Sequence, residues 1–154
     1  MTFDRNTLDV RVIESALLRL AEGVGSRLRA ASLCGRTIQL KLRVEPFETR
    51  TRQRTLAVPT DDDLTVFRVA RALLRDALAA DREAGRTSPV RLIGVSASGL
   101  EAAQQLGLFE GARTARLNAA LDAVRKRFGD DALDRASARD STQRRRFADG
   151  PKLK

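Results

Sequence analysis

The stretch RTIQLKLRV, residues 36–44, decides the fold of this chain. Its apolar residues recur at every second position, and polar or cationic residues fill the positions between them. The apolar set is Ile38, Leu40, Leu42 and Val44, and the polar set is Thr37, Gln39, Lys41 and Arg43. A period of two predicts a strand with one apolar face and one cationic face.

A second strand is predicted after a proline-containing break. The stretch ETRTRQRTLAV, residues 48–58, is rich in Thr, which favours strands. Arg50, Arg52 and Arg54 share one face of it. Like charges at alternate positions repel in a packed sheet, so we expect this face to lie in water or against an anion. A bulge near Phe47 would invert the face.

An amphipathic helix is predicted before this pair of strands. Apolar residues recur there at spacings of four, three, four and four, at Ile13, Leu17, Leu20, Val24 and Leu28. Asn6 or Thr7 signals its start, and Gly35 suits a left-handed stop.

A second helix is predicted to start at Thr60-Asp61-Asp62-Asp63. Thr60 serves as the N-cap and Asp63 as the reciprocal capping carboxylate. The expected buried stripe is Leu64, Phe67, Ala70, Leu74 and Leu78. A metal site is the alternative use of the three aspartates. Because successive helical residues point in different directions, we favour capping and predict no metal ligands.

A short apolar strand, residues 90–96, follows a loop at 85–89. The order helix, strand, strand, helix, strand is five-sixths of a split βαββαβ, ferredoxin-like unit of the α+β class. Two helices would cover one face of an antiparallel sheet and leave the other open. The first strand is largely missing in this interpretation, since only residues 1–3 remain for it, which suggests a chain cut from a longer protein.

Charge points to a polyanionic partner. The chain has 29 Lys and Arg against 20 Asp and Glu, a net charge of +9, and nucleic acid is the leading candidate. The absence of His excludes His-based catalysis. Cys34 is the single cysteine, so an intrachain disulfide is excluded. We expect Cys34 to be a buried small hydrophobe. No apolar run approaches 18 residues and no signal peptide is evident, so we expect a cytoplasmic protein with no membrane partner.

The strand cations suit phosphates better than base edges. The candidate set is Lys41, Arg43, Arg50, Arg52 and Arg54, with hydroxyl donors from Thr49, Thr51 and Thr55. Readers of single strands place aromatic rings on such a sheet, but this chain has no Tyr or Trp, and none of its Phe residues lies in a predicted strand. Duplex backbone binding is therefore favoured, and a solvated face without a partner is the alternative.

A second candidate site is the stretch QLGLF, residues 105–109. Gln105 is a polar anchor, and Leu106, Leu108 and Phe109 can enter an apolar pocket on another protein. Alternatively, these side chains fold back onto their own domain.

Taken together, TIQLKLRVEPFETRTRQRTL, PVRLIGVSASGL and QLGLF resemble the little-finger domain of bacterial Y-family translesion polymerases of the DNA polymerase IV type. The resemblance covers about residues 3–109, and LDAVRKRFGDDAL also resembles the tail of several such proteins. It implies a domain that grips template-primer duplex for error-prone damage bypass and is tethered to a catalytic core outside this chain. The implied plan is a DNA-binding domain at 1–100, a linker with a clamp-binding motif at 101–112, an amphipathic helical segment at 113–136 and a disordered basic tail at 137–154.

The resemblance also assigns roles to residues. Thr51, Arg52 and Arg54 match backbone-contacting positions, as does Arg91, whereas Leu92 stands where some relatives have a second basic residue. The family's sliding-clamp motif matches Gln105, Leu106, Leu108 and Phe109. No palm motif with catalytic carboxylates is present, so we expect no catalytic residue, metal or cofactor in this chain, and Mg²⁺ in the parent polymerase.

Two other classes of function remain open at this point. A standalone basic RNA-binding protein of split βαβ fold would also explain the charge. A small-molecule regulatory domain on the same scaffold is less favoured, because a cationic open face suits dimer packing poorly and no Gly-rich ligand loop is visible.

Overall fold

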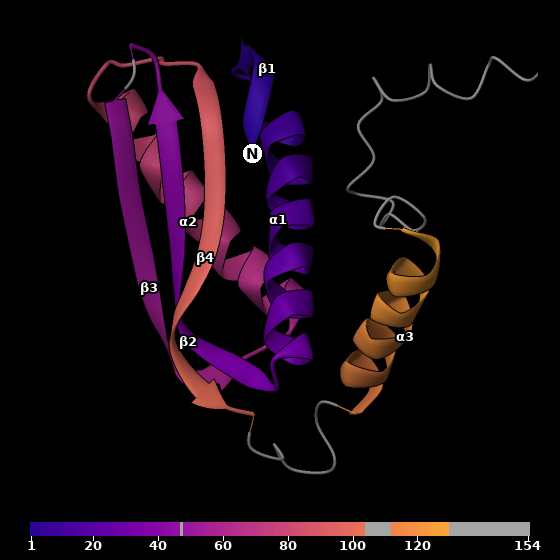
Figure 1. The fold of residues 1–154 in the computed structure, drawn as a ribbon. Helices are drawn as coiled ribbons and strands as arrows, with labels where there is room; N and C mark the ends of the chain where they lie inside the picture. The colour runs from indigo at the N-terminus through magenta and orange to yellow at the C-terminus, as the bar shows by residue number, and fades with distance from the viewer. Residues whose placement is uncertain (47, 104–111, 130–154) are drawn as a thin grey trace, which may run out of the picture.

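The computed structural model of the chain describes residues 1–46, 48–103 and 112–129. Figure 1 shows a four-stranded sheet with α2 behind it, α1 along its side and α3 beside α1. The elements are β1 (Thr2–Thr7), α1 (Val10–Ala30), β2 (Leu33–Val44), β3 (Glu48–Thr60), α2 (Asp63–Glu83), β4 (Val90–Ala102) and α3 (Ala112–Phe128).

The sheet has the order β1-β4-β2-β3, and every neighbouring pair is antiparallel. Both α1 and α2 contribute to one apolar core with the inner face of the sheet. This arrangement confirms the predicted α+β, ferredoxin-like class. It also confirms the apolar face of β2, because Ile38, Leu40, Leu42 and Val44 are all buried.

The prediction that the first strand is largely missing is wrong. β1 forms a six-residue strand that pairs with β4, with Thr2 opposite Leu92. The main chain carries this pairing: the Ile93 amide donates to the Met1 carbonyl at 3.0 Å, and the terminal ammonium donates to the Ile93 carbonyl at 2.8 Å. Edge pairing of this kind needs no apolar alternation, so the sequence pattern did not reveal it.

The helix caps also differ from those predicted. Asp9 caps α1, since its carboxylate accepts a hydrogen bond from the Arg11 amide at 2.8 Å, while Asn6 and Thr7 belong to β1. The left-handed residue after α1 is Ser32 with φ 53°, and the predicted stop, Gly35, lies within β2. Only Ala31 and Ser32 therefore separate α1 from β2.

Asp62, rather than Thr60, caps α2. Its Oδ2 accepts hydrogen bonds from the amide and hydroxyl of Thr65, at 2.8 and 2.7 Å. Thr60 ends β3 and accepts a hydrogen bond from the Asp62 amide instead. Of the stripe predicted for α2, Ala70 and Leu74 are buried. The remaining three members are half-buried, and Val66, Leu73 and Ala77 complete the buried side.

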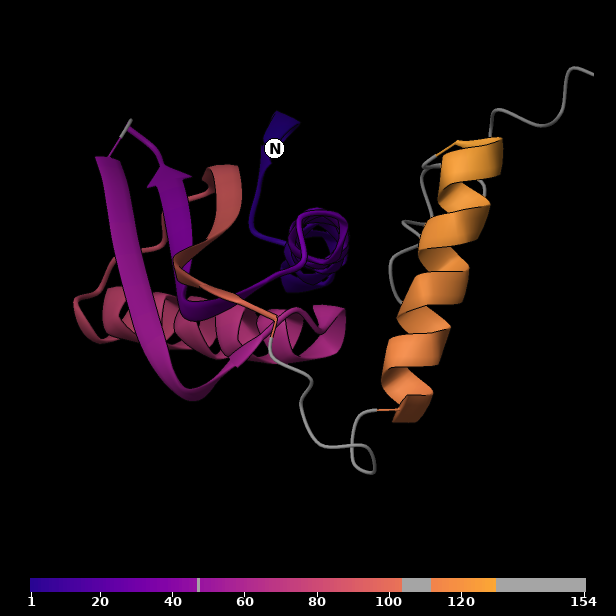
Figure 2. The ribbon, with the colours of Figure 1, turned by 60° about the horizontal axis from the view of Figure 1, so that its bottom comes forward.

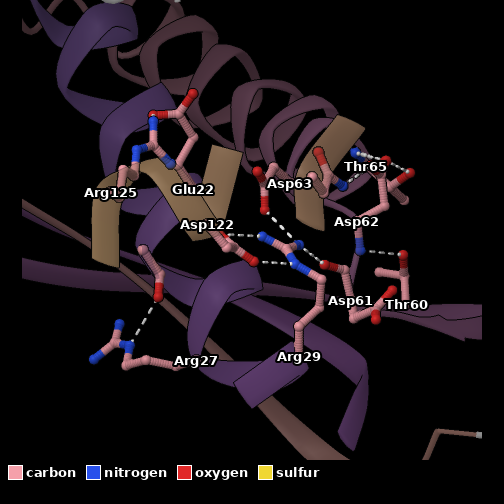
Figure 3. A network of polar contacts seen from close by, with 12 residues as sticks. Glu22, Arg27, Arg29, Thr60, Asp61, Asp62, Asp63, Thr65, Asp122 and Arg125 are labelled. Carbon is pink, nitrogen blue, oxygen red and sulfur yellow. Dashed lines mark hydrogen bonds and ion pairs between the residues drawn. The ribbon is translucent and has the colours of Figure 1, made fainter. Parts of the chain in front are cut away.

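α3 packs beside α1 through polar side chains. Figure 3 shows the network that joins α3 to the end of α1 and the start of α2. Three contacts hold α3: Arg29 with Asp122 at 2.7 Å, Glu22 with Arg125 at 2.7 Å, and Asp62 with Asn118 at 3.0 Å. The helix ends at Phe128. Residues 130–136 of the predicted 113–136 segment, the 137–154 tail and the 105–109 motif lie outside the described residues.

No helix among the described residues is long and apolar enough to span a membrane. Cys34 is buried in β2, and burial raises the pKa of its thiol.

Candidate nucleic-acid interface

The face of the sheet that points away from α1 and α2 is polar. In the ladder, Lys41 lies opposite Thr51 on one side and Gly94 on the other. Residues directly opposite one another on antiparallel strands share a face. The register therefore assigns to this open face Thr37, Gln39, Lys41 and Arg43 of β2, Thr49, Thr51, Gln53 and Thr55 of β3, and Leu92, Gly94, Ser96 and Ser98 of β4.

Hydroxyl, amide and cationic groups dominate this open face. The Thr37 and Thr55 hydroxyl oxygens lie 3.1 Å apart, and the Ser96 hydroxyl donates to Gln39 Oε1 at 3.3 Å. Lys41 and Arg43 are exposed. None of the twelve positions is a carboxylate or an aromatic residue. Such a surface offers donors to phosphate oxygens and no ring on which a base could stack.

The three arginines of β3 do not share this open face, contrary to our expectation. Arg50, Arg52 and Arg54 lie opposite Leu42, Leu40 and Ile38, which point into the helix-covered side. The register after the turn, with Val44 opposite Glu48, places the threonines of β3 outward and its arginines inward. Because β3 is an edge strand, Arg52 and Arg54 still extend past the sheet edge and are exposed.

Arg50 is the least available of the three. It forms ion pairs with Glu48 at 2.7 Å and with Asp81 of α2. Hydrogen bonds to Glu48 and Asp81 raise the pKa of the Arg50 guanidinium, and the same guanidinium lowers the pKa of Glu48. These contacts tie β3 to α2, so Arg50 has a structural role here.

Arg54 and Arg91 have other surroundings. Arg54 lies 3.4 Å from Asp76 of α2, and both side chains are about half exposed. Arg91 is half-buried at the irregularity where Arg43 pairs with Leu92 and Val44 with Val90. DNA contacts by either residue remain predictions.

The aspartates at the start of α2 do not fit a metal ion. Asp62 accepts hydrogen bonds from Thr65 and Asn118, and Asp63 forms a 2.8 Å ion pair with Arg29. A guanidinium therefore occupies the place next to Asp63 that a cation would need. No group of three or more Asp, Glu or Cys residues suited to a metal occurs within the described part of the chain.

Sequence reasoning missed three polar members of the open face: Gln53, Ser96 and Ser98. Ser96 lies between the half-buried Val95 and Ala97, so extending the period of two along β4 would have found it, whereas Gln53 lies between exposed arginines and carries no such signal.

Comparison with known proteins shows the family of this domain. The model of the "impB/mucB/samB family C-terminal domain" matches residues 1–108. The chain belongs to this family. The match covers the whole sheet with α1 and α2, and it confirms the resemblance to the little-finger domain of Y-family polymerases of the DNA polymerase IV type.

Two relatives illustrate the extent of the similarity. The chain is 35% identical over 144 residues to DNA polymerase IV of Desulfatibacillum aliphaticivorans, which covers 89% of this chain and 35% of that protein. It is 47% identical over 91 residues to DNA polymerase IV of Streptomyces coelicolor, which covers 59% of this chain and 18% of that protein. The chain thus spans about a third or less of the length of these curated relatives.

Among solved structures, "Dbh Ternary Complex (substrates partially disordered)" superposes with a TM-score of 0.50 at 24% identity, over 62% of this chain and 26% of that one. This likeness supports the fold.

Proposed function

We propose that this domain grips the backbone of duplex DNA on its open face, as the non-catalytic module of an error-prone, translesion DNA polymerase. The carrying observation is the uncovered sheet face with Lys41, Arg43 and neighbouring hydroxyl and amide groups, without a carboxylate at any of the twelve positions that β2, β3 and β4 contribute to it. Phosphate contacts of this kind hold a duplex without reading its sequence. A template with a damaged base offers the same backbone, which suits bypass.

We assign the edge arginines a smaller contribution to the same duplex binding. Arg52 and Arg54 project from the rim of the sheet, and Thr51 and Thr55 lie on the open face beside them. Rim guanidinium groups can reach a second phosphate row once the duplex rests on the open face. Arg91 is retained as a further candidate, whereas the ion pairs of Arg50 make its contribution the smallest.

The catalytic core and its Mg²⁺ lie outside this chain in our proposal. Clamp docking by Gln105, Leu106, Leu108 and Phe109 would raise the effective concentration of the parent enzyme at a primer end. We place the parent enzyme in the bacterial cytoplasm. The DNA polymerase IV relatives favour this function over the RNA-binding alternative.

A paired substitution tests the open face. Lys41→Gln with Arg43→Gln should weaken duplex binding and flatten the slope of log affinity against log salt by about 1.8, since each phosphate contributes about 0.9. The matched control is Arg116→Gln with Lys126→Gln, which removes the same charge from exposed positions of α3. Duplex affinity is measured by fluorescence anisotropy at several salt concentrations. An equal loss of affinity in the two double variants would show that net charge, and not the open face, determines binding.

The clamp proposal has its own test. Leu108→Ala with Phe109→Ala should abolish co-elution of the chain with a bacterial sliding clamp and leave duplex affinity unchanged. Unaltered co-elution would refute docking through this motif.

A further inference from the structure

A row of arginines follows the outer side of α2. Arg68, Arg75 and Arg82 are spaced by seven residues and are all exposed. Seven residues rotate a helix by close to two full turns, so the three side chains leave α2 in nearly the same direction. The buried residues of α2, such as Val66 and Ala70, leave from its opposite side.

These three arginines differ from the other charged residues of α2 in their contacts. Within the described residues, none of the three forms a side-chain hydrogen bond or an ion pair. The other charges of α2 are largely paired: Asp63 with Arg29, Arg71 with Glu14, Asp76 with Arg54, and Asp81 with Arg50 and Arg86. Glu83 follows Arg82 by one residue and so points about 100° away from the row. The row is therefore a stripe of one sign.

The open face leaves most of the positive charge unexplained. Lys41 and Arg43 are its two cations, and with Arg52 and Arg54 at its rim they make four of the 29 Lys and Arg residues of the chain. The outer side of α2 and the open face lie on opposite sides of the two-layer domain (Figures 1 and 2). A straight duplex resting on the open face cannot touch the row.

We propose that the row formed by Arg68, Arg75 and Arg82 binds the phosphate backbone of a second DNA duplex. Neighbouring arginines of the row are about 10.5 Å apart along the helix axis. A major groove is about 12 Å wide, so two guanidinium groups at this spacing can reach phosphates on its two walls. The choice of DNA as ligand rests on the proposed function of the open face. The domain would then bridge two duplex segments.

The stoichiometry of binding tests this inference. The full chain is titrated with excess 12-base-pair DNA at low salt, and bound duplexes per chain are counted by analytical ultracentrifugation. We expect two for the unmodified protein and one for the triple variant Arg68→Gln, Arg75→Gln, Arg82→Gln. The weaker event should have a salt slope of about −2.7, a loss of about 40-fold in affinity between 50 and 200 mM salt.

Two controls separate this inference from the proposed function. The variant Arg27→Gln, Arg116→Gln, Lys126→Gln removes equal charge elsewhere and should still bind two duplexes. Lys41→Gln with Arg43→Gln should weaken the tighter event and leave the one at the row unchanged. If Lys41→Gln with Arg43→Gln leaves both binding events unchanged while the other variants behave as expected, the open-face proposal is refuted and duplex binding by the row is still supported.

Three outcomes would overturn the inference: one duplex bound by the unmodified chain, an equal loss in the control triple, or tighter binding of A-form RNA than of DNA at the row.

Discussion

Two interfaces of α1 use opposite chemistry. Toward the sheet, α1 buries apolar side chains such as Leu17 against the inner face of β2 and β4. Toward α3, it presents Glu22 and Arg29, which meet Arg125 and Asp122 (Figure 3). The first interface is stabilised by removal of apolar area from water, and the second by ion pairs between partly buried groups.

The second interface reverses the usual orientation of an amphipathic helix. α3 docks through Asn118, Asp122 and Arg125, which share one side of the helix. Two of its apolar residues point into solvent, since Leu117 is 50% exposed and Phe128 66% exposed, while Leu121 and Val124 are half-buried. The docking of α3 therefore depends mainly on charge, whereas the sheet, α1 and α2 share an apolar core in addition to their ion pairs. The variants below separate the two kinds of interface.

The largest effect is expected in the apolar core. Leu40 of β2 is fully buried between β3 and β4, and Leu40→Ala should lower the free energy of unfolding by about 2–5 kcal/mol through lost transfer energy and a residual cavity. Urea unfolding measures this change. Leu117→Ala, at a half-exposed position of α3, should shift the free energy by about 0.5 kcal/mol or less. Similar losses for both variants would mean that α3 belongs to the core.

The next effect concerns the centre of the polar network. Arg29 contacts Asp63, Asp122 and the Asp61 carbonyl. Burial alone would lower the pKa of Arg29, but the ion pairs with Asp122 and Asp63 raise it above its ordinary value.

Arg29→Met should cost about 3 kcal/mol, because it takes the guanidinium away from a buried carboxylate, and it should also release α3. Urea unfolding gives the stability, and hydrogen exchange of the α3 amides reports release. Arg27→Met, at an exposed position of the same helix, is the matched control and should change little. Protected α3 amides in Arg29→Met would show that other contacts hold the helix.

The period of two in residues 36–44 was enough to predict the buried face of β2, because alternation within one strand is a local property. The faces of β3 were not predictable from its own residues. Threonines and arginines alternate there equally well in either orientation, and only the pairing of Val44 with Glu48 decides which set points outward.

The polar network around Arg29 could not be predicted from the sequence either. Asp61–Asp63 carried a clear helix-start signal, and an aspartate does cap α2. The partners of these carboxylates come from α1 and α3, more than 30 and 50 residues away along the chain. No local pattern marks Arg29 as their neighbour, because its distance to Asp63 depends on how two helices cross.

Substitutions of two glycines in α1 test how closely α1 approaches the start of α2. A Cβ at Gly25 would overlap the Asp63 carboxylate and approach Arg29 Nη1 and the Asp61 carbonyl to 2.9 Å. Gly25→Ala should therefore lower the free energy of unfolding by about 1–3 kcal/mol. Gly23 has nothing within 4 Å of the same position, so Gly23→Ala should raise stability by up to about 1 kcal/mol through helix propensity. Urea unfolding of the two variants should give opposite signs, and equal signs would contradict the close approach at Gly25.

Acid should release α3 before it unfolds the core, and this is the smallest expected effect. Burial alone would raise the pKa values of Asp62 and Asp122. Hydrogen bonds from Thr65 and Asn118 to Asp62, and the contact of Asp122 with Arg29, instead lower both below their ordinary 3.8. A lowered pKa adds stability above the ordinary value and loses it as pH falls through the native value.

Docking of α3 should accordingly be constant from pH 8 to 5, where the chain has no His to titrate, and weaken below about pH 3.8. The side-chain amide of Asn118, buried against Asp62, gives an NMR signal that reports docking directly. Asp122→Asn should shift this transition, since it removes one of the three carboxylates in contact with α3 and leaves Asp62 and Glu22. A transition between pH 5 and 8, or an identical curve for Asp122→Asn, would show that charge on these two aspartates does not hold the helix.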